Sequence, residues 1–230
     1  DDYILAAFLQ ACTPLIAGVF SIVWLRKHYT GLFKFPPMDE IINSYKEGWS
    51  IFISSLAVNL YTATNVVVLG MLTNNVIVGY YSAADKLITC VRRGIYAVSD
   101  AIYPFISKMM KDDIPKGLRF IKKQLFLYLV VGLVGCTSLF LFSDTIVKLL
   151  FGADYDLTVD ILRILSFVPL AVAISTVFGE ETMLPLNMNS AYSRTLVLGA
   201  FFSLISIFPL CYLWGAKGVA ITMLLTEFLI

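Results

Sequence analysis

The chain has 230 residues, of which 59% are hydrophobic and 14% are charged, and its formal net charge at pH 7 is +1. A soluble globular domain averages about 25% charged residues, so this composition predicts an integral membrane protein and argues against a soluble domain. A net charge this small gives no sign of an acidic partner, and we expect no nucleic-acid partner. With one histidine, His28, the sequence excludes a multi-histidine metal site, and we expect no metal or cofactor.

The cysteines lie singly in apolar runs and show no CxxC spacing, which is typical of small buried residues and not of a disulfide framework or a metal cluster. They are Cys12, Cys90, Cys136 and Cys211. The chain begins at Asp1 and ends inside an apolar segment, so we expect a fragment, and the lack of a signal peptide carries no information.

Seven apolar segments predict an all-α, polytopic membrane protein. In chain order they cover residues 4–25, 47–71, 80–111, 124–142, 157–178, 195–213 and 219–230. Proline residues predict kinks within three of them, at Pro14, Pro169 and Pro209. The polar stretch from Ser143 to Asp156 predicts a short interfacial helix from Thr145 to Phe151 that ends at Gly152.

The basic residues predict the orientation of these segments. Alternate connections place eleven Lys and Arg residues on one side of the membrane, in loops such as the one from Lys108 to Lys123, and two on the other, Lys148 and Lys217. We therefore expect residues 26–46 and the Lys108–Lys123 connection to be cytoplasmic, and the turn at Asn74 to face outward. Glu180 and Glu181 are expected at a solvated cytoplasmic edge.

The third segment carries charged residues inside an apolar run, and winding it at 100° per residue sorts these residues by face. One face carries Asp85, Thr89, Arg92, Tyr96, Ser99, Asp100 and Tyr103, with Lys86 and Arg93 at its edge. The opposite face is apolar and is expected to contact lipid or a protein core. The polar face extends for roughly 27 Å at a rise of 1.5 Å per residue, which is nearly the depth of a bilayer.

Free energies of insertion exclude lipid as the environment of the polar face. Five charges at membrane depth cost on the order of 15 kcal/mol, whereas the apolar residues of the same helix contribute about 7 kcal/mol. The face therefore needs water or counter-charges. One interpretation is a polar passage through the membrane. The other is a structural network in which Arg92 and its neighbours are neutralised by Asp85 and Asp100, and the two interpretations are compatible.

Several stretches resemble the second half of bacterial O-antigen flippases, which are polysaccharide exporters of the multidrug/oligosaccharidyl-lipid/polysaccharide superfamily. The most specific are NLYT, VGYYSAADKL and YPFISK; LRILSFVPL, GEETMLPLNM and WGAKGVAITMLLTE are also similar. The family has twelve helices in two six-helix lobes. The resemblance implies that residues 1–46 contain the sixth helix and an inter-lobe loop, and that residues 47–230 form the C-terminal lobe.

The resemblance further implies that the protein moves an undecaprenyl-diphosphate-linked oligosaccharide from the cytoplasmic to the periplasmic leaflet of the bacterial inner membrane. Alternating access coupled to H⁺ or Na⁺ is the implied mechanism, with Asp85 and Asp100 as the ion-coupling residues. The implied partners are the lipid-linked oligosaccharide, inner-membrane lipids and the polysaccharide polymerase and chain-length machinery.

The residue types of the polar face suit such a substrate, because a diphosphate needs cations and sugars need hydroxyl, amide and aromatic groups. The cations are Arg92, Arg93 and Lys86, and the sugar-binding candidates are Asn59, Tyr96, Ser99 and Tyr103. Asn59 and Asn65 are alternatively interhelical contacts. Arg163 is expected to be a structural partner.

Two other functions require sequence features that differ from those of this chain. A cation-coupled multidrug or metabolite antiporter of the same superfamily predicts a more acidic or apolar cavity than this face, which carries three cations and two acids. An enzyme such as a polymerase or glycosyltransferase needs catalytic groups in sizeable loops, and these connections are short. We therefore expect a transporter and not an enzyme.

Overall fold

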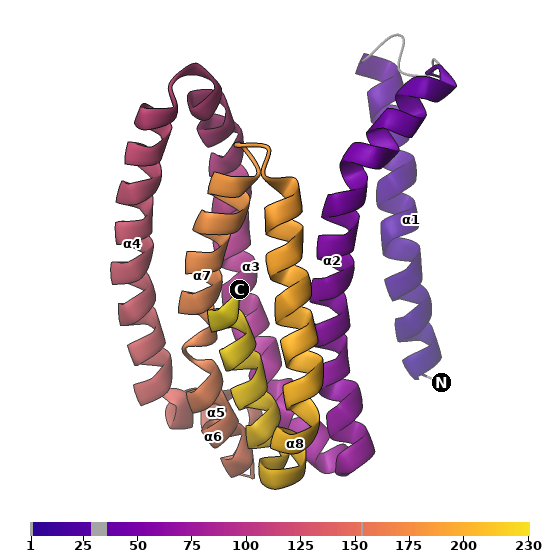
Figure 1. The fold of residues 1–230 in the computed structure, drawn as a ribbon. Coiled ribbons are helices and arrows are strands. Elements are labelled where there is room, and N and C mark those ends of the chain that lie inside the picture. The colour runs from indigo at the N-terminus through magenta and orange to yellow at the C-terminus, as the bar shows by residue number, and fades with distance from the viewer. Residues whose placement is uncertain (1, 29–35, 153) are drawn as a thin grey trace. The chain divides into compact units, whose positions relative to one another are not determined.

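The computed structural model describes residues 2–28, 36–152 and 154–230, and this part of the chain is helical with short connections and no strand. The all-α prediction is therefore confirmed. In chain order the elements are α1 (Asp2–His28), α2 (Met38–Leu72), α3 (Asn75–Asp112), α4 (Ile114–Leu141), α5 (Ser143–Phe151), α6 (Asp156–Leu165), α7 (Val168–Phe178), the π-helical turn η1 (Gly179–Met183) and α8 (Asn189–Leu229) (Figure 1).

The helices cover all seven segments that the sequence predicts to be apolar. Within the described residues, four stretches are long and apolar enough to cross a membrane: Ile51–Leu72, Ile114–Leu141, Asp156–Met183 and Asn189–Leu229. The last stretch contains two of the predicted segments, 195–213 and 219–230. They are separated at Gly215, where the backbone leaves the helical conformation. The number of seven crossings stays a prediction.

The chain divides into two compact units, residues 1–46 and 47–230. The first unit contains α1, which includes Pro14 and ends with Arg26, Lys27 and His28 in its last turn. Large apolar side chains of α1 are exposed along its length, among them Phe8, Leu15, Phe20 and Trp24. An exposed apolar surface of this kind is what a helix in contact with lipid requires.

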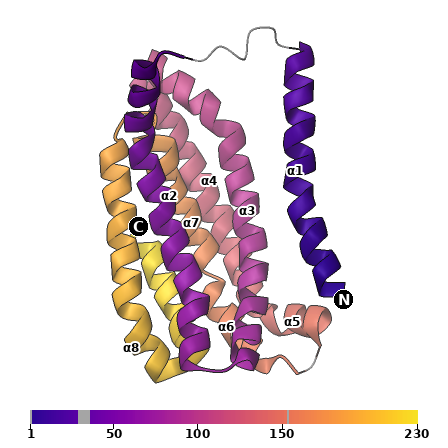
Figure 2. The ribbon, with the colours of Figure 1, turned by 90° about the vertical axis from the view of Figure 1, so that its right-hand side faces the viewer.

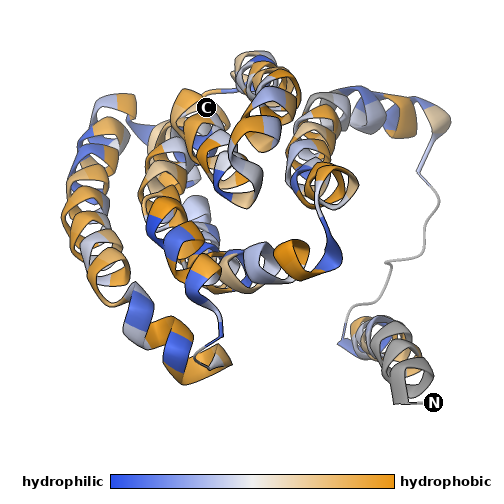
Figure 3. Cartoon of the chain, turned by 90° about the horizontal axis from the view of Figure 1, so that it is seen from below, coloured by the Kyte–Doolittle hydropathy of each residue, from blue (hydrophilic) through white to orange (hydrophobic). Residues whose placement is uncertain are grey.

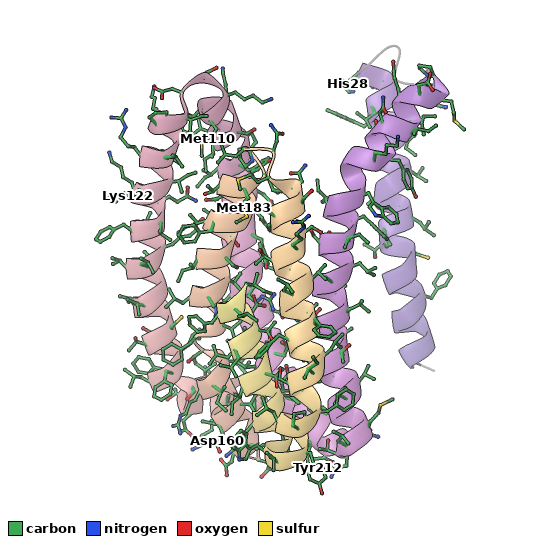
Figure 4. All side chains as sticks on the ribbon, in the orientation of Figure 1. His28, Met110, Lys122, Asp160, Met183 and Tyr212 are labelled. Carbon is green, nitrogen blue, oxygen red and sulfur yellow. The ribbon has the colours of Figure 1, made fainter. Side chains whose placement is uncertain are left out.

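The second unit is a helical bundle with two distinct ends. The end near Met110 and Lys122, which carries the Lys108–Lys123 connection, is called the basic end, and the end near Asp160 and Tyr212 is called the distal end (Figure 4). The largest apolar cluster packs residues from α2, α3, α6, α7 and α8 around the distal half, including Leu69, Ile88, Leu162 and Met223. A smaller cluster at the basic end joins Ile106 and Met110 to Ile121 and Val177.

The fifth predicted segment forms two helices, because Pro169 lies in the first turn of α7. A proline has no backbone N–H for the preceding turn, so the helix breaks at Ser166 and Phe167 and α7 begins at Val168.

The expected interfacial helix is α5, which ends at Gly152 and lies at the distal end of the bundle (Figure 2). Hydrophobic residues are numerous along the helices and are interspersed with polar ones (Figure 3).

The chain reverses direction inside α8, so that residues 216–229 run back beside the preceding arm (Figure 1). Gly215 has φ 56° and ψ −131°, a conformation that a side chain makes costly. Gly218 lies against the backbone of the first arm, and a Cβ atom at this position would overlap the carbonyl oxygen of Leu210. Two glycines therefore allow the tight reversal that brings the end of the chain back into the bundle.

Replacing Gly218 by alanine should destabilise the bundle by about 3 kcal/mol, because the overlapping atom belongs to the backbone and cannot rotate away. The matched control is Gly135→Ala on the exposed face of α4, where a Cβ atom meets nothing within 4 Å. The measurement is thermal unfolding of the purified protein in detergent. Equal midpoints for the two variants would contradict the close approach at Gly218.

Candidate functional site

A cavity of about 760 Å³ lies between α2, α3, the α7–η1 segment and α8. Its wall includes Ser55, Asn59 and Thr62 from α2, and Glu180 and Tyr192 from the far side. Leu69 of α2 packs in the large apolar cluster, which closes the distal half of the bundle. Nearer the basic end, the same helix presents polar side chains to the cavity instead of packing against a neighbour.

The polar face of α3 forms one wall of this cavity. The lining residues from this helix are Thr89, Arg92, Arg93, Tyr96, Ser99, Asp100 and Tyr103. Helical periodicity predicts each of these residues on the polar face of this helix or at the edge of that face. Asn59 also lines the cavity, and its side-chain amide donates to the Ser55 carbonyl at 2.8 Å. Six of the seven candidate substrate-binding residues therefore line one cavity, and the exception is Lys86, which is exposed on α3 and lines neither cavity described here.

Asp85 lies at a second, smaller cavity of about 60 Å³, whose wall also includes Asn65, Tyr81 and Met223. The polar face of α3 is thus divided, because Asp85 and Asp100 line different cavities. Arg92 and Thr89 line both cavities and mark the division. The structure does not bring the two candidate ion-coupling carboxylates together.

Arg92 forms an ion pair with Glu227, with 3.3 Å between the guanidinium Nη2 and the carboxylate Oε1. The Tyr61 hydroxyl donates to the same oxygen at 3.1 Å. Glu227 is 4% exposed and Tyr61 is 2% exposed. This cluster of Tyr61, Arg92 and Glu227, called the Glu227 junction here, joins α2, α3 and the second arm of α8.

The network interpretation names Asp85 and Asp100 as the acids that neutralise Arg92, and the structure adds a third acid that this interpretation does not include. The ion-pair partner of Arg92 is Glu227, which comes from a helix more than 130 residues further along the chain. Its signal was present in the sequence: an acidic residue in an otherwise apolar run, TMLLTEFLI, is a candidate for a functional or paired role at membrane depth. No periodicity within α3 identifies such a partner.

The expectation of a solvated edge at Glu180 and Glu181 is wrong for Glu181, whereas Glu180 is partly exposed at the cavity. Glu181 is fully buried, and its Oε1 accepts hydrogen bonds from Ser99 at 2.8 Å and Gln124 at 2.9 Å. Glu180 lines the cavity and is partly buried, and the Tyr192 hydroxyl donates to it at 3.4 Å. Residues 179–183 thus belong to the interior of the bundle and not to a connecting loop.

The π-helical turn explains how two consecutive glutamates leave the surface. The Leu184 N–H donates to the Gly179 carbonyl at 3.3 Å, five residues back, which widens the turn relative to an α-helix. Tyr192 packs directly on Gly179, where a Cβ atom would lie 2.6 Å from its ring. One glutamate then faces the cavity and its neighbour faces α3 and α4.

Arg163 is held at the distal end, away from the cavity. Its Nε donates to the Ser143 hydroxyl at 3.1 Å, and its Nη1 lies 4.0 Å from Asp160. Asp160 also pairs with Lys217 at 2.7 Å. The contacts of Arg163 with α5 and α6 agree with the structural role that was expected for it.

Comparison with known proteins gives this cavity a family context. Residues 1–110 match the family model described as polysaccharide biosynthesis protein. Over the whole chain, the protein is 31% identical to an Escherichia coli K12 protein and 29% identical to one from Shigella dysenteriae, both named "Putative O-antigen transporter". Residues 1–110 are therefore similar to the polysaccharide biosynthesis protein family, and the whole chain is similar to the two transporters. The resemblance recognised in the sequence is therefore confirmed.

The matched relatives are longer than this chain. It covers 55% of the Escherichia coli protein and 57% of the Shigella protein. A capsular polysaccharide biosynthesis protein, CapF of Staphylococcus aureus, is 27% identical over 76% of the chain and 44% of its own length. No solved structure matches the chain. The family and the apolar helices together identify a multi-pass protein of the bacterial inner membrane.

The Glu227 junction predicts a rescue between two substitutions in the full-length protein. Arg92→Ala leaves a buried carboxylate without its cation and should cost about 3 to 5 kcal/mol of stability. Adding Glu227→Gln removes that charge and should restore most of the loss, measured by thermal unfolding in detergent.

The matched control is Arg93→Ala, because Arg93 is exposed and makes no ion pair within the described residues. Its effect on stability should stay within about 0.5 kcal/mol. A double variant as unstable as Arg92→Ala alone would show that Glu227 is not the relevant partner.

Proposed function

We propose that the protein moves an undecaprenyl-diphosphate-linked oligosaccharide from the cytoplasmic to the periplasmic leaflet by alternating access. The observation that carries this proposal is a cavity between helices that are long and apolar enough to cross a membrane, with guanidinium groups beside hydroxyl, amide and aromatic side chains. The family and the names of the relatives support a polysaccharide cargo. A cavity for apolar drugs would not need this density of hydrogen-bonding groups.

The two arginines that could bind a diphosphate differ in their exposure and in their ion pairing. Arg93 is exposed at the cavity and makes no ion pair within the described residues, so its guanidinium is open to an incoming anion. Arg92 is buried and already paired with Glu227. A diphosphate at Arg92 must therefore compete with the Glu227 carboxylate, and its higher charge and bidentate geometry favour it in that competition.

The remaining side chains suit the sugar part of the cargo. Asn59, Ser99 and Tyr103 offer an amide and two hydroxyl groups along the cavity wall, and Tyr96 adds an aromatic surface. Such groups bind sugars by hydrogen bonds and ring stacking without requiring one sugar sequence. In this proposal, Asp100 in the large cavity and Asp85 in the small one remain candidates for ion coupling.

The arrangement of polar and apolar layers supports a state that loads from the cytoplasm. The cavity lies toward the basic end, and the large apolar cluster packs α2 against α3, α6 and α8 in the distal half. If the basic end is cytoplasmic, substrate enters there while the periplasmic path is closed. Alternating access then requires α2 to separate from this cluster near Leu69 and to close at the basic end.

The orientation predicts which positions an impermeant thiol reagent reaches in intact cells. In a cysteine-free background, single cysteines at Asn74 and Lys217 should be labelled from the periplasm. Cysteines at Lys111 and Arg194 should be labelled only after the membrane is permeabilised. Labelling of position 111 from outside would reverse the proposed direction of loading.

Export of O-antigen distinguishes a substrate-binding Arg92 from a purely structural one. In cells that lack their own transporter, the full-length Arg92→Ala/Glu227→Gln protein should be stable but should restore almost no surface O-antigen, and Arg92→Lys should restore part of it. Wild-type export by the double variant would mean that Arg92 is only a counter-ion. Lys108→Ala, an exposed position on α3 outside the cavity, is the control and should export normally.

A further inference from the structure

The basic residues of the second unit gather on one connection. Toward the basic end this unit has seven Lys and Arg residues, and all but Arg194 lie in the stretch from Lys108 to Lys123. These six are exposed, and the acids among them are Asp112 and Asp113. The positive-inside rule depends on how many basic residues the cytoplasmic loops carry and does not require them to gather around one helix. Their concentration at the α3–α4 connection therefore needs a further reason.

One face of α4 carries three of these cations and continues into apolar residues. At 100° per residue the six members of this face align along the helix, and all of them are exposed. This face is called the α4 stripe here and consists of Lys116, Arg119, Lys123, Leu127, Val131 and Val134. The stripe is charged at its basic end and apolar along the rest of its length, as a phospholipid is.

The α4 stripe belongs to a peripheral helix. Within the described residues, 11% of the apolar window of α4 is buried, against 67% for the window in Asp156–Met183, so most of α4 is open to its surroundings (Figure 1). Beside the cations, Phe120 of α4 contacts Phe105 of α3, with ring centroids 5.4 Å apart. Phe105 is exposed, so the neighbouring helix adds an aromatic surface where the charged part of the stripe meets the apolar part.

The three cations of the α4 stripe form no ion pair within the part of the chain that the structure describes. Arg119 Nε donates to the Pro115 carbonyl at 3.4 Å, a contact that leaves its two terminal nitrogens available to a ligand. Lys116 lies in the first turn of α4, at the positive end of the helix dipole, where a cation is unfavourable and an anion is favoured. The local electrostatics therefore suit a bound anion.

We propose that the α4 stripe binds an anionic phospholipid of the membrane. Lys116, Arg119 and Lys123 would hold its phosphate, for which the arginine supplies a bidentate guanidinium and the lysines supply point charges. An acyl chain would lie along the apolar part of the stripe. Val134 is roughly 16 Å beyond Lys123 at 1.5 Å per residue, close to the hydrocarbon depth of one leaflet, about 15 Å. If the basic end is cytoplasmic, the lipid belongs to the cytoplasmic leaflet.

Bound lipid would act on the interior of the bundle through α4. Gln124, which follows Lys123 in the chain, is buried and donates to Glu181 at 2.9 Å. Holding the first turns of α4 at the membrane surface would therefore stabilise the contact between α4 and η1. Glu180, next to Glu181, lines the cavity, so the lipid would stabilise one of its walls. That such a lipid affects export rests on the function proposed above; that it binds does not.

Thermal unfolding of the full-length protein in a neutral detergent tests the site without any transport measurement. Phosphatidylglycerol titrated into the micelles should raise the unfolding midpoint in a saturable way, because a ligand of the folded state stabilises it. Phosphatidylcholine should not, because its headgroup carries no net charge. Lys116→Gln/Arg119→Gln/Lys123→Gln should require roughly a hundredfold more phosphatidylglycerol for half of the maximal shift, at about fivefold for each basic residue beside an anionic headgroup.

The matched control is Lys108→Gln/Lys111→Gln/Lys122→Gln, which removes the same charge from the same connection but leaves the α4 stripe intact. It should keep the wild-type response to phosphatidylglycerol. If the triple variant of the stripe does not fold, Lys123→Gln alone carries the test, with an expected weakening of about fivefold.

Three results would overturn the proposal. The first is an equal shift of the wild-type midpoint by phosphatidylglycerol and phosphatidylcholine, or no shift by either. The second is a control variant that is weakened as much as the stripe variant, because total charge and not the stripe would then decide binding. The third is a saturable shift by glycerol 3-phosphate, which has the phosphate without acyl chains, at the concentrations at which phosphatidylglycerol acts; the ligand would then be a soluble phosphate.

The outcome is separable from that of the export experiment. A protein that exports O-antigen but shows no response to phosphatidylglycerol loses only this inference. A protein that shows the response but no dependence of export on Arg92 loses only the proposed substrate contact.

Discussion

The cavity depends on the contacts that the Glu227 carboxylate makes with two other helices. Its Oε1 accepts a hydrogen bond from Tyr61 and pairs with Arg92, so a single buried oxygen connects α2, α3 and the end of α8. Toward the distal end α2 is held by apolar packing at Val68 and Leu69. At the depth of the cavity its buried contacts include this junction and a small cluster in which Ala57 and Tyr61 meet Ala200. A polar junction therefore forms part of the boundary of the open space beside α2.

A buried ion pair contributes little net stability compared with apolar side chains of similar size, but losing one partner is costly. In the proposed transport cycle, the Glu227 junction would suit a bundle that changes its contacts. If an anionic substrate takes Arg92 from Glu227, this polar link between α3 and α8 is lost at the moment when the cavity becomes occupied, while their apolar packing in the distal half remains. Occupancy and helix packing would then be coupled through one guanidinium group, with no need for a separate sensor.

Much of the cavity wall follows from the sequence of α3 alone. Charge and hydroxyl groups at helical spacing identify the face that cannot contact lipid, and Arg92, Ser99 and Tyr103 indeed line the cavity. The break before α7 and the end of α5 were also predictable, because Pro169 and Gly152 constrain the backbone locally. These predictions succeed because each depends on residues within a few turns of one another.

The two acids missed as partners depend on information that no single segment contains. Glu227 reaches Arg92 only because the chain reverses at Gly215. Glu181 is buried within a π-helical turn, in which the Leu184 N–H donates to the Gly179 carbonyl five residues back, and helical periodicity does not identify such a turn. A polar residue in an apolar run indicates that a partner exists, but tertiary structure determines which residue it is.

The π-helical turn also limits how the sequence of this region can change in length. A π-turn is equivalent to an α-helix that has accommodated one additional residue. Removing any one residue between Gly179 and Met183 would restore α-helical spacing and rotate the residues beyond it by about 100° relative to α7. A deletion at Gly179 would then turn Glu180 and Glu181 away from their present environments. Related chains that keep both the buried and the cavity-lining acid must therefore preserve the length of this turn as strictly as its composition.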